Sequence, residues 1–334
     1  MSQTLRHLAS FADLGAVNAA RVLAHAADLK SNGASPLMAG KSMGLLFADP
    51  SLRTRTSMDQ ACHRLGGRAL ALDVGAGTWK LETADGVRMD TDKPEHVREA
   101  APVLSQYLDA LGIRAFSRTG SVAEEDADQF LQAFRQHARV PVLNLESARE
   151  HPCQGMADML TVQEEFGTCA GTRIALSWAP HIKRLPRAVP NSVLLTAAAM
   201  GCEISIAAPE GYQLGAGVIA QAQRLASASG GSVHQTNDQA EALNGCQVLY
   251  AKAWGPVGEA APADDPALSH WMPKLSHFDK AAANAVFMHC LPVRRDVEIG
   301  AEVLDSERAR VVAQAGNRLY VQMAMLSWMF GHDF

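Results

Sequence analysis

The feature that most constrains the fold is the alternation of short apolar runs with segments of helical period. Runs rich in Val, Ile and Leu recur along the chain and are separated by stretches whose apolar residues fall at helical spacing. Continuous apolar strands are typical of parallel sheets covered on both faces. The predicted strands are residues 42–47, 68–74, 112–116 and 140–145 in the first half, and 173–178, 203–207, 247–251 and 285–289 in the second. We therefore expect an α/β protein.

The length of the chain favours two domains. Its 334 residues exceed the roughly 150 residues of an ordinary domain. We expect two doubly wound parallel-sheet domains, 1–148 and 149–318, and a C-terminal helix in 319–334, where apolar residues recur at helical spacing. Because ligands of open α/β sheets bind at the carboxyl ends of strands, the two domains are expected to face a shared cleft.

Composition and charge exclude several classes of protein. A formal charge of -5 and a pI near 6.2 provide no basic field for nucleic acid. The longest apolar-rich stretch, 194–202, is too short to span a bilayer, and residues 1–10 lack a signal-peptide core. The six cysteines form no CxxC pair. We expect a cytoplasmic protein that acts on small molecules, without nucleic-acid or membrane partners.

The segment 49–57 predicts a phosphate site. It joins a strand to a helix whose apolar face is Met58, Ala61, Cys62 and Leu65. Unpaired backbone N–H groups at a helix N-terminus attract anions. Hydroxyl groups and the guanidinium groups of Arg53 and Arg55 add donors and charge. The alternative interpretation is an exposed, hydroxyl-capped helix start with solvated arginines.

Nucleotide-binding motifs offer a weaker alternative. The chain has no GxxxxGK[ST] motif, and no GxGxxG follows a predicted strand. Gly215, Gly217 and Ala220 match a loose GxGxxA pattern, but the segment before them is not a clear strand. We interpret it as a helix start, so a nicotinamide-dependent oxidoreductase remains only a secondary hypothesis.

Three motifs occur in order along nearly the whole chain. They are Ser51-Leu52-Arg53-Thr54-Arg55-Thr56, His151-Pro152-Cys153-Gln154 and His289-Cys290-Leu291-Pro292. Together they resemble the aspartate/ornithine carbamoyltransferase family. The resemblance implies a carbamoyl-phosphate domain, a second domain for the amine substrate, a homotrimer with active sites shared between subunits, and neither metal nor cofactor.

The second domain is similar to the N-acylornithine branch of that family. Ornithine enzymes carry an Asp-Thr-Trp segment where this chain has Lys252 in residues 249–255. A cation there disfavours a free α-ammonium and favours a substrate whose α-nitrogen is acylated. In this branch the loop that corresponds to 178–192 belongs to a backbone knot, which the resemblance alone implies here.

Residues 89–96 bear on the acyl group. N-acetylornithine enzymes resemble this stretch but carry glutamate where Pro94 stands, whereas proline is typical of N-succinylornithine enzymes. A glutamate would repel the succinyl carboxylate, while proline is neutral and stiff. Glu298 stands where the acetyl enzymes often have lysine. The resemblance therefore favours N-succinylornithine as the acceptor in arginine biosynthesis, with N-acetylornithine as the alternative and a catalytically idle trimeric paralogue as a rival.

The resemblance also implies roles for individual residues. The carbamoyl-phosphate ligands would be Ser51, Leu52, Arg53, Thr54, Arg55, Trp79 from a neighbouring subunit, Arg114, His151, Gln154, Cys290, Leu291 and Arg318. Arg114, His151 and Thr54 would polarise the carbonyl oxygen, and Cys290 would lie near the attacking nitrogen. The amine substrate would contact Glu146, His181, Lys252 and Arg294.

Some of these residues have plainer interpretations. His151 before a proline fits a helix entry, and Cys290 fits a small buried apolar residue. Glu146 and Arg295 fit the two partners of a structural ion pair, and Trp79 fits an ordinary core or interface aromatic.

Overall fold

The computed structural model describes residues 5–116, 122–256 and 266–332. The chain divides into two compact units, Met1–Cys153 with Arg318–Phe334, and Gln154–Asn317. Each unit contains its own parallel sheet. The C-terminal segment thus groups with the first unit.

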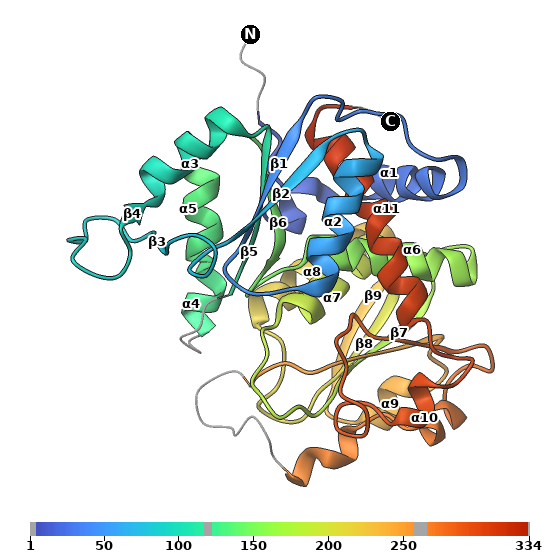
Figure 1. Cartoon of the computed structure of the whole chain (residues 1–334). Helices are drawn as coiled ribbons and strands as arrows, with labels where there is room; N and C mark the ends of the chain where they lie inside the picture. Colours follow the sequence, from blue (N-terminus) through green and yellow to red (C-terminus); the bar gives the residue numbers. More distant parts are fainter. Residues whose placement is uncertain (1–4, 117–121, 257–265, 333–334) are drawn as a thin grey trace. The chain divides into compact units, whose positions relative to one another are not determined.

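The first unit is built on a four-stranded parallel sheet of order β2-β1-β5-β6. Its strands are β1 (Ser42–Phe47), β2 (Arg68–Asp73), β5 (Ala110–Ala115) and β6 (Val142–Ser147), with a short pair β3 (Leu81–Glu82) and β4 (Glu95–His96). Its helices are α1 (Phe11–Asn32), α2 (Leu52–Arg64), α3 (Val97–Tyr107), α4 (Val122–Ala127) and α5 (Gln129–His137). Figure 1 shows α3 and α5 on one side of the sheet and α1 and α2 on the other. Because helices cover both faces, β1 and β5 are buried, with Leu46, Leu111 and Phe134 in the core.

The second unit is built on a five-stranded parallel sheet of order β11-β10-β7-β8-β9. Its strands are β7 (Arg173–Trp178), β8 (Glu203–Ala207), β9 (Ser232–Thr236), β10 (Val248–Lys252) and β11 (Val286–Met288). Its helices are α7 (Ala188–Ala199), α8 (Ala216–Ser229), α9 (Gln239–Leu243), α10 (Ala301–Leu304), η1 (Pro266–Trp271) and η2 (Leu275–Asp279). The unit boundaries fall within α6 (Pro152–Phe166) and α11 (Val311–Met329).

One glycine sets the packing of α6 on α7. A Cβ atom at Gly155 would lie 2.7 Å from the carbonyl oxygen of Ser192. Only glycine permits this close approach of two helices. α7 is buried along its whole length, and its sequence is apolar apart from Asn191, Ser192 and Thr196.

All eight strands expected from the sequence are present, and the α/β class is confirmed. The bounds of β1, β7 and β8 agree with the predicted ranges, and the others shift by at most two residues. β9 was missed because Ser232–Thr236 is a partly exposed edge strand with a polar sequence. The predicted helix start after Gly215 is confirmed, since Gly215 is the N-cap of α8.

Two further observations concern the sequence-based expectations. Across the described ranges, no helix combines the length and hydropathy needed to cross a bilayer. The terminal helix is present but starts earlier than expected, because α11 already begins at Val311. The backbone knot and the shared cleft stay predictions.

Candidate active site

The first candidate site residues lie where α2 begins, directly after β1. Ser51 has an extended backbone and caps the helix, since its Oγ accepts a hydrogen bond from the backbone N–H of Thr54 at 3.2 Å. Leu52 is the first helical residue, and its side chain is 80% exposed. A helix that begins with a serine cap and no acidic residue in its first turn leaves its positive end available to an anion.

Basic groups from distant segments gather at this helix start. Arg318, on α11, donates from Nη1 to the buried Oγ1 of Thr54 at 3.2 Å. Arg53, Arg114 and Arg318 lie close enough to His151 for their charges to act on its imidazole. We refer to Arg53, Thr54, Arg114, His151 and Arg318 as the basic cluster. All five belong to the first unit.

His151 is a neutral donor in this cluster. Its side chain is buried, and burial, followed by the charges of Arg318, Arg114 and Arg53, holds its pKa well below the usual range. A neutral imidazole surrounded by cations is a hydrogen-bond donor rather than a further charge. His151 is therefore suited to polarise a carbonyl oxygen.

Glu146 is the carboxylate of this region. It forms an ion pair with Arg114, and its Oε2 lies 3.6 Å from Nε2 of His151. Arg114 also lies over the ring of Phe116, 4.9 Å from the ring centroid. The sequence offered Arg295 as an ion-pair partner of Glu146, but the structure pairs Glu146 with Arg114 and Arg295 with Asp305. The role of Glu146 at the amine substrate stays a prediction.

Three further predicted residues lie apart from the basic cluster. Arg55 forms an ion pair with Asp73 and covers the ring of Phe47. Trp79 is 60% exposed and donates from Nε1 to Glu95 at 2.6 Å, and Pro94 is exposed. Within the described part of the chain, neither Trp79 nor Pro94 is hydrogen-bonded or ion-paired to the basic cluster. Such exposure is compatible with residues that act in a neighbouring subunit.

The second unit brings together a different set of charges. The buried carboxylate of Glu298 accepts from Nζ of Lys252 at 3.4 Å and from Nε2 of His289 at 3.0 Å. It also accepts from the backbone N–H of Ala253 and of Arg294. Burial alone would raise the pKa of Glu298, but Lys252 and His289 hold it well below the usual range. We refer to Lys252, His289 and Glu298 as the Glu298 cluster.

His289 connects this cluster to the backbone turn that carries Cys290. Its Nδ1 accepts the backbone N–H of Leu291 at 3.0 Å, so Nε2 carries the proton that is donated to Glu298. Leu291 has a φ of 56°, in the left-handed region that non-glycine residues rarely adopt. Cys290 is buried in this turn.

His181 and Arg294 meet at the surface of the second unit. Nε of Arg294 donates to Nε2 of His181 at 3.3 Å, while Nδ1 of His181 lies 3.0 Å from the carbonyl oxygen of Lys183. Burial lowers the pKa of His181, and nearby Lys252 and Arg294 lower it further. Among the described residues Arg294 has no carboxylate in ion-pair range, so an exposed guanidinium is presented there.

Sequence reasoning missed the residues that hold these groups in place. Gln154 donates to Asp158, one helical turn later on α6, and Asp158 also accepts from Gln314. The i, i+4 spacing of Gln154 and Asp158 was the only available signal for the first contact. Glu298 was noted only as a departure from the acetyl enzymes.

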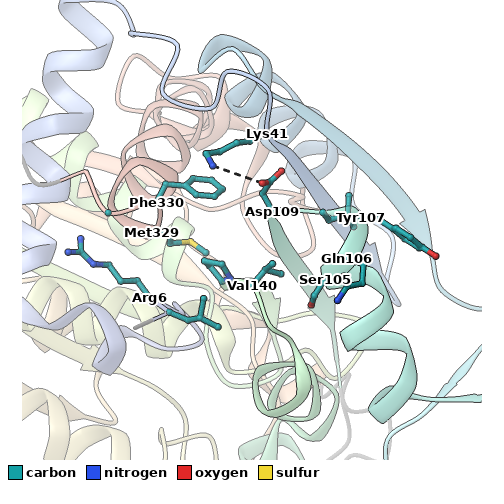
Figure 2. Close-up of a pocket in the computed structure, with 13 residues that line it drawn as sticks. Arg6, Lys41, Ser105, Gln106, Tyr107, Asp109, Val140, Met329 and Phe330 are labelled. Atoms are coloured by element: carbon teal, nitrogen blue, oxygen red, sulfur yellow. Dashed lines mark ion pairs between the residues drawn. The ribbon is translucent and has the colours of Figure 1, made fainter. Parts of the chain in front are cut away.

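A pocket of about 840 Å³ lies elsewhere in the first unit (Figure 2). It is lined by residues that precede β1, β5 and β6, including Lys41, Asp109 and Pro141. Lys41 and Asp109 form an ion pair, and Lys41 also lies over the ring of Phe330. This pocket is at the amino ends of the strands, whereas the basic cluster lies at their carboxyl ends.

Two family models match the chain. Residues 6–164 match the carbamoyl-phosphate binding domain of aspartate/ornithine carbamoyltransferase, and residues 186–329 match the Asp/Orn binding domain.

Curated relatives agree with these matches. An N-acetylornithine carbamoyltransferase of Xanthomonas campestris is 36% identical, with 99% of each chain covered. An N-succinylornithine carbamoyltransferase of Bacteroides fragilis is also 36% identical, with 83% of this chain and 84% of the relative covered. An ornithine carbamoyltransferase of Nostoc is 36% identical, with 98% of each covered.

Solved structures share the fold. An acetylornithine transcarbamylase complexed with acetylcitrulline superposes with a TM-score of 0.92 at 35% identity, covering 97% of this chain and 99% of the other. A variant of N-acetyl-L-ornithine transcarbamylase with a glutamate replaced by proline, complexed with carbamyl phosphate and N-succinyl-L-norvaline, has a TM-score of 0.91 at 35% identity and covers 97% of this chain and all of the other. With both family models matched and these relatives, the chain belongs to the aspartate/ornithine carbamoyltransferase family, in its N-acylornithine branch.

Proposed function

We propose that this enzyme transfers the carbamoyl group of carbamoyl phosphate to the δ-amine of N-succinyl-L-ornithine, yielding N-succinyl-L-citrulline and phosphate for arginine biosynthesis. Family membership and the named relatives support carbamoyl transfer to an N-acylornithine. The preference for a succinyl over an acetyl group on the substrate rests mainly on Pro94.

The basic cluster is the observation that carries the donor site. Arg53, Arg114 and Arg318 surround a neutral imidazole at a serine-capped helix start. A phosphate dianion there would accept hydrogen bonds from backbone N–H groups, from the hydroxyls of Ser51 and Thr54 and from the guanidinium groups. Each hydrogen bond to a charged group contributes about 1.5 to 3 kcal/mol. Arg318 already contacts Thr54, so both residues converge on the same ligand.

The reaction needs no covalent intermediate on the enzyme. The neutral δ-amine attacks the carbonyl carbon, and the resulting tetrahedral oxyanion lies near Arg114, His151 and Thr54. A preorganised donor at an oxyanion contributes about 3 to 4 kcal/mol. The bond between carbon and the phosphate oxygen then breaks, and the leaving phosphate takes the proton that the amine nitrogen releases.

Charges in the second unit support an acylated substrate. Lys252 and Arg294 contribute two cations, and Glu298 neutralises the first of them. The exposed guanidinium of Arg294 suits a substrate carboxylate, whereas a free α-ammonium would be repelled. His181, which contacts Arg294, would bind beside it.

Pro94 supports the succinyl substrate. It is neutral and exposed, and it immediately precedes β4. The acetyl enzymes resemble this stretch with a glutamate at the position, and a glutamate-to-proline variant of one such enzyme was solved with N-succinyl-L-norvaline. In the proposed homotrimer, Pro94 and Trp79 would reach the site of a neighbouring subunit.

An amine panel tests the function. The purified enzyme is supplied with carbamoyl phosphate and, separately, with ornithine, N-acetylornithine, N-succinylornithine or putrescine, and ureido product is measured. We expect the highest kcat/KM with N-succinylornithine. An equal or higher value with N-acetylornithine would leave the carbamoyl transfer in place and replace the acceptor.

Two variants test whether a negative charge at position 94 changes the acyl preference. Pro94→Glu restores the acidic side chain and is expected to shift the succinyl-to-acetyl ratio of kcat/KM at least tenfold towards acetyl, because a carboxylate repels the succinyl carboxylate. Pro94→Ala is the neutral control and keeps the preference of the wild type. An unchanged ratio in Pro94→Glu would remove Pro94 from the specificity argument.

A further inference from the structure

A fully buried carboxylate in the second unit holds two amide side chains. Asp158 lies on α6, one turn after Gln154. Its Oδ1 accepts from Nε2 of Gln154 at 2.6 Å and from Nε2 of Gln314 at 2.6 Å. Such short contacts to an ionised acceptor are the strong class of hydrogen bond.

The charge of Asp158 determines which way both amides face. An ionised carboxylate has no proton to donate, so each glutamine must turn its NH2 group towards it and its carbonyl oxygen away. Gln314 follows this rule, because its Oε1 accepts the backbone N–H of His289 at 3.0 Å. By the same rule the oxygen of Gln154 is directed away from Asp158 as an acceptor.

The chain of bonds continues into the turn after β11. The backbone N–H of His289 donates to Oε1 of Gln314, and the His289 ring accepts the N–H of Leu291. Tyr250 closes the other side, since Nε2 of Gln314 lies 3.3 Å from its hydroxyl oxygen. Burial, followed by the nearby charge of Asp158, raises the pKa of Tyr250 well above its usual range, so the hydroxyl keeps its proton.

We propose that Asp158 is a positioning residue that orients, through Gln154 and Gln314, the groups that bind the carbamoyl amide. The amide NH2 of carbamoyl phosphate is a donor and needs acceptors, which the oxygen of Gln154 and the carbonyl groups of the 289–291 turn supply. This inference rests on the proposed function, because it requires those groups to face the carbamoyl end of the donor.

Calorimetry with two ligands tests the inference. Asp158→Asn keeps the shape of the side chain but removes the charge and adds an NH2 group that can turn towards either glutamine. We expect phosphonoacetamide, a stable analogue with the carbamoyl amide, to bind at least tenfold more weakly than to the wild type. Inorganic phosphate, which needs only the basic cluster, should bind within twofold of the wild type.

Other outcomes separate the inference from the proposed function. Equal weakening of both ligands would identify Asp158 as a general structural residue and overturn the inference. Unchanged phosphonoacetamide binding in Asp158→Asn would overturn it as well. Failure of the wild type to bind either ligand would instead contradict the proposed donor site.

Two additional variants distinguish a specific effect on ligand binding from a general loss of folding. Gln314→Met removes the link to His289 while Gln154 and Asp158 remain paired, and it should also weaken phosphonoacetamide selectively, by at least threefold. Thr161→Val lies on the same helix and removes a buried hydroxyl that donates to Ala157 and accepts from Asn317. This control should leave both affinities unchanged; a loss equal to that of Asp158→Asn would overturn the inference.

Discussion

The two units bury charge in opposite ways. In the first unit, three guanidinium groups surround a neutral histidine, and Glu146 is the carboxylate in contact with that set. In the second unit, Glu298 is surrounded by Lys252, His289 and two backbone N–H groups, so charge and hydrogen-bonding capacity are matched locally.

This difference indicates different tasks. Excess positive charge inside a protein is costly unless an anion compensates it, so we expect the basic cluster to bind a dianion. A compensated cluster stabilises the fold without a ligand and fixes the turn that carries Cys290. Removing a charged group should therefore reduce activity in the first unit and stability in the second.

Glu298→Gln is expected to have the largest effect on stability. Without the carboxylate, the ammonium of Lys252 stays largely buried and uncompensated, which costs about 3 to 5 kcal/mol in the free energy of unfolding. Because the folded-state pKa of Glu298 is lowered, this contribution is present above the ordinary glutamate pKa and is lost as the pH falls through the folded value. Urea denaturation of the wild type and of Glu298→Gln at pH 7.5 measures the difference in the free energy of unfolding.

The control for this variant is Asp305→Asn. Asp305 pairs with Arg295 in the same unit, but both side chains are more than half exposed. Its loss should leave the free energy of unfolding close to that of the wild type, because exposed ion pairs contribute little to stability. Equal losses in the two variants would remove the distinction between a buried and an exposed pair.

Arg53→Ala is expected to lower kcat/KM by about 100- to 1000-fold, the usual effect of deleting a donor to developing charge. Its free energy of unfolding should stay the same or rise, because a like charge is removed from the basic cluster. Arg135→Ala is the matched control, since Arg135 pairs with Asp13 in the same unit. That control should retain its activity; a similar loss of kcat/KM in both variants would contradict the assignment of Arg53 to the donor site.

Glu150→Gln should give the smallest effect, with a sign opposite to that of Glu298→Gln. Burial raises the pKa of Glu150 to about 7, although the N–H of Phe11 partly offsets this. The folded state therefore holds the proton more tightly, and the ionised carboxylate costs stability above pH 7, a cost that vanishes as the pH falls towards the ordinary value.

At pH 8.5 the Glu150→Gln variant should gain up to about 3 kcal/mol. The gain should shrink to about 1 kcal/mol at pH 5 and approach zero near pH 3.5, because only below its ordinary pKa is the side chain protonated in the unfolded chain as well. Thermal melts of both proteins across this pH range measure the difference. A gain independent of pH would exclude ionisation of Glu150 as its cause.

Much of the fold could be predicted from the sequence because buried strands have mostly apolar local sequences. β1, β7 and β8 are apolar over most of their length and were placed to the residue. β9 was missed because all five of its side chains are at least partly exposed and four of them are polar. The motifs at residues 51–56 and 151–154 predicted a donor site because each follows a strand end.

The long-range contacts that hold the site residues in place could not be predicted. Glu298 lies 46 residues from Lys252, and Gln314 lies 156 residues from Asp158. Neither pair leaves a local pattern, because the contacts depend on how β10, β11 and α11 are arranged. The ion pair of Arg55 with Asp73 was likewise not predicted, and the role of Arg55 as a phosphate ligand stays a prediction.

The basic cluster of the first unit is proposed to bind the phosphate end of carbamoyl phosphate. Isothermal titration of inorganic phosphate into the wild type and into Arg53→Ala tests it most directly. We predict saturable binding to the wild type and at least 100-fold weaker binding to the variant. Equal affinity for both proteins, or no binding to the wild type, would exclude the basic cluster as the phosphate site.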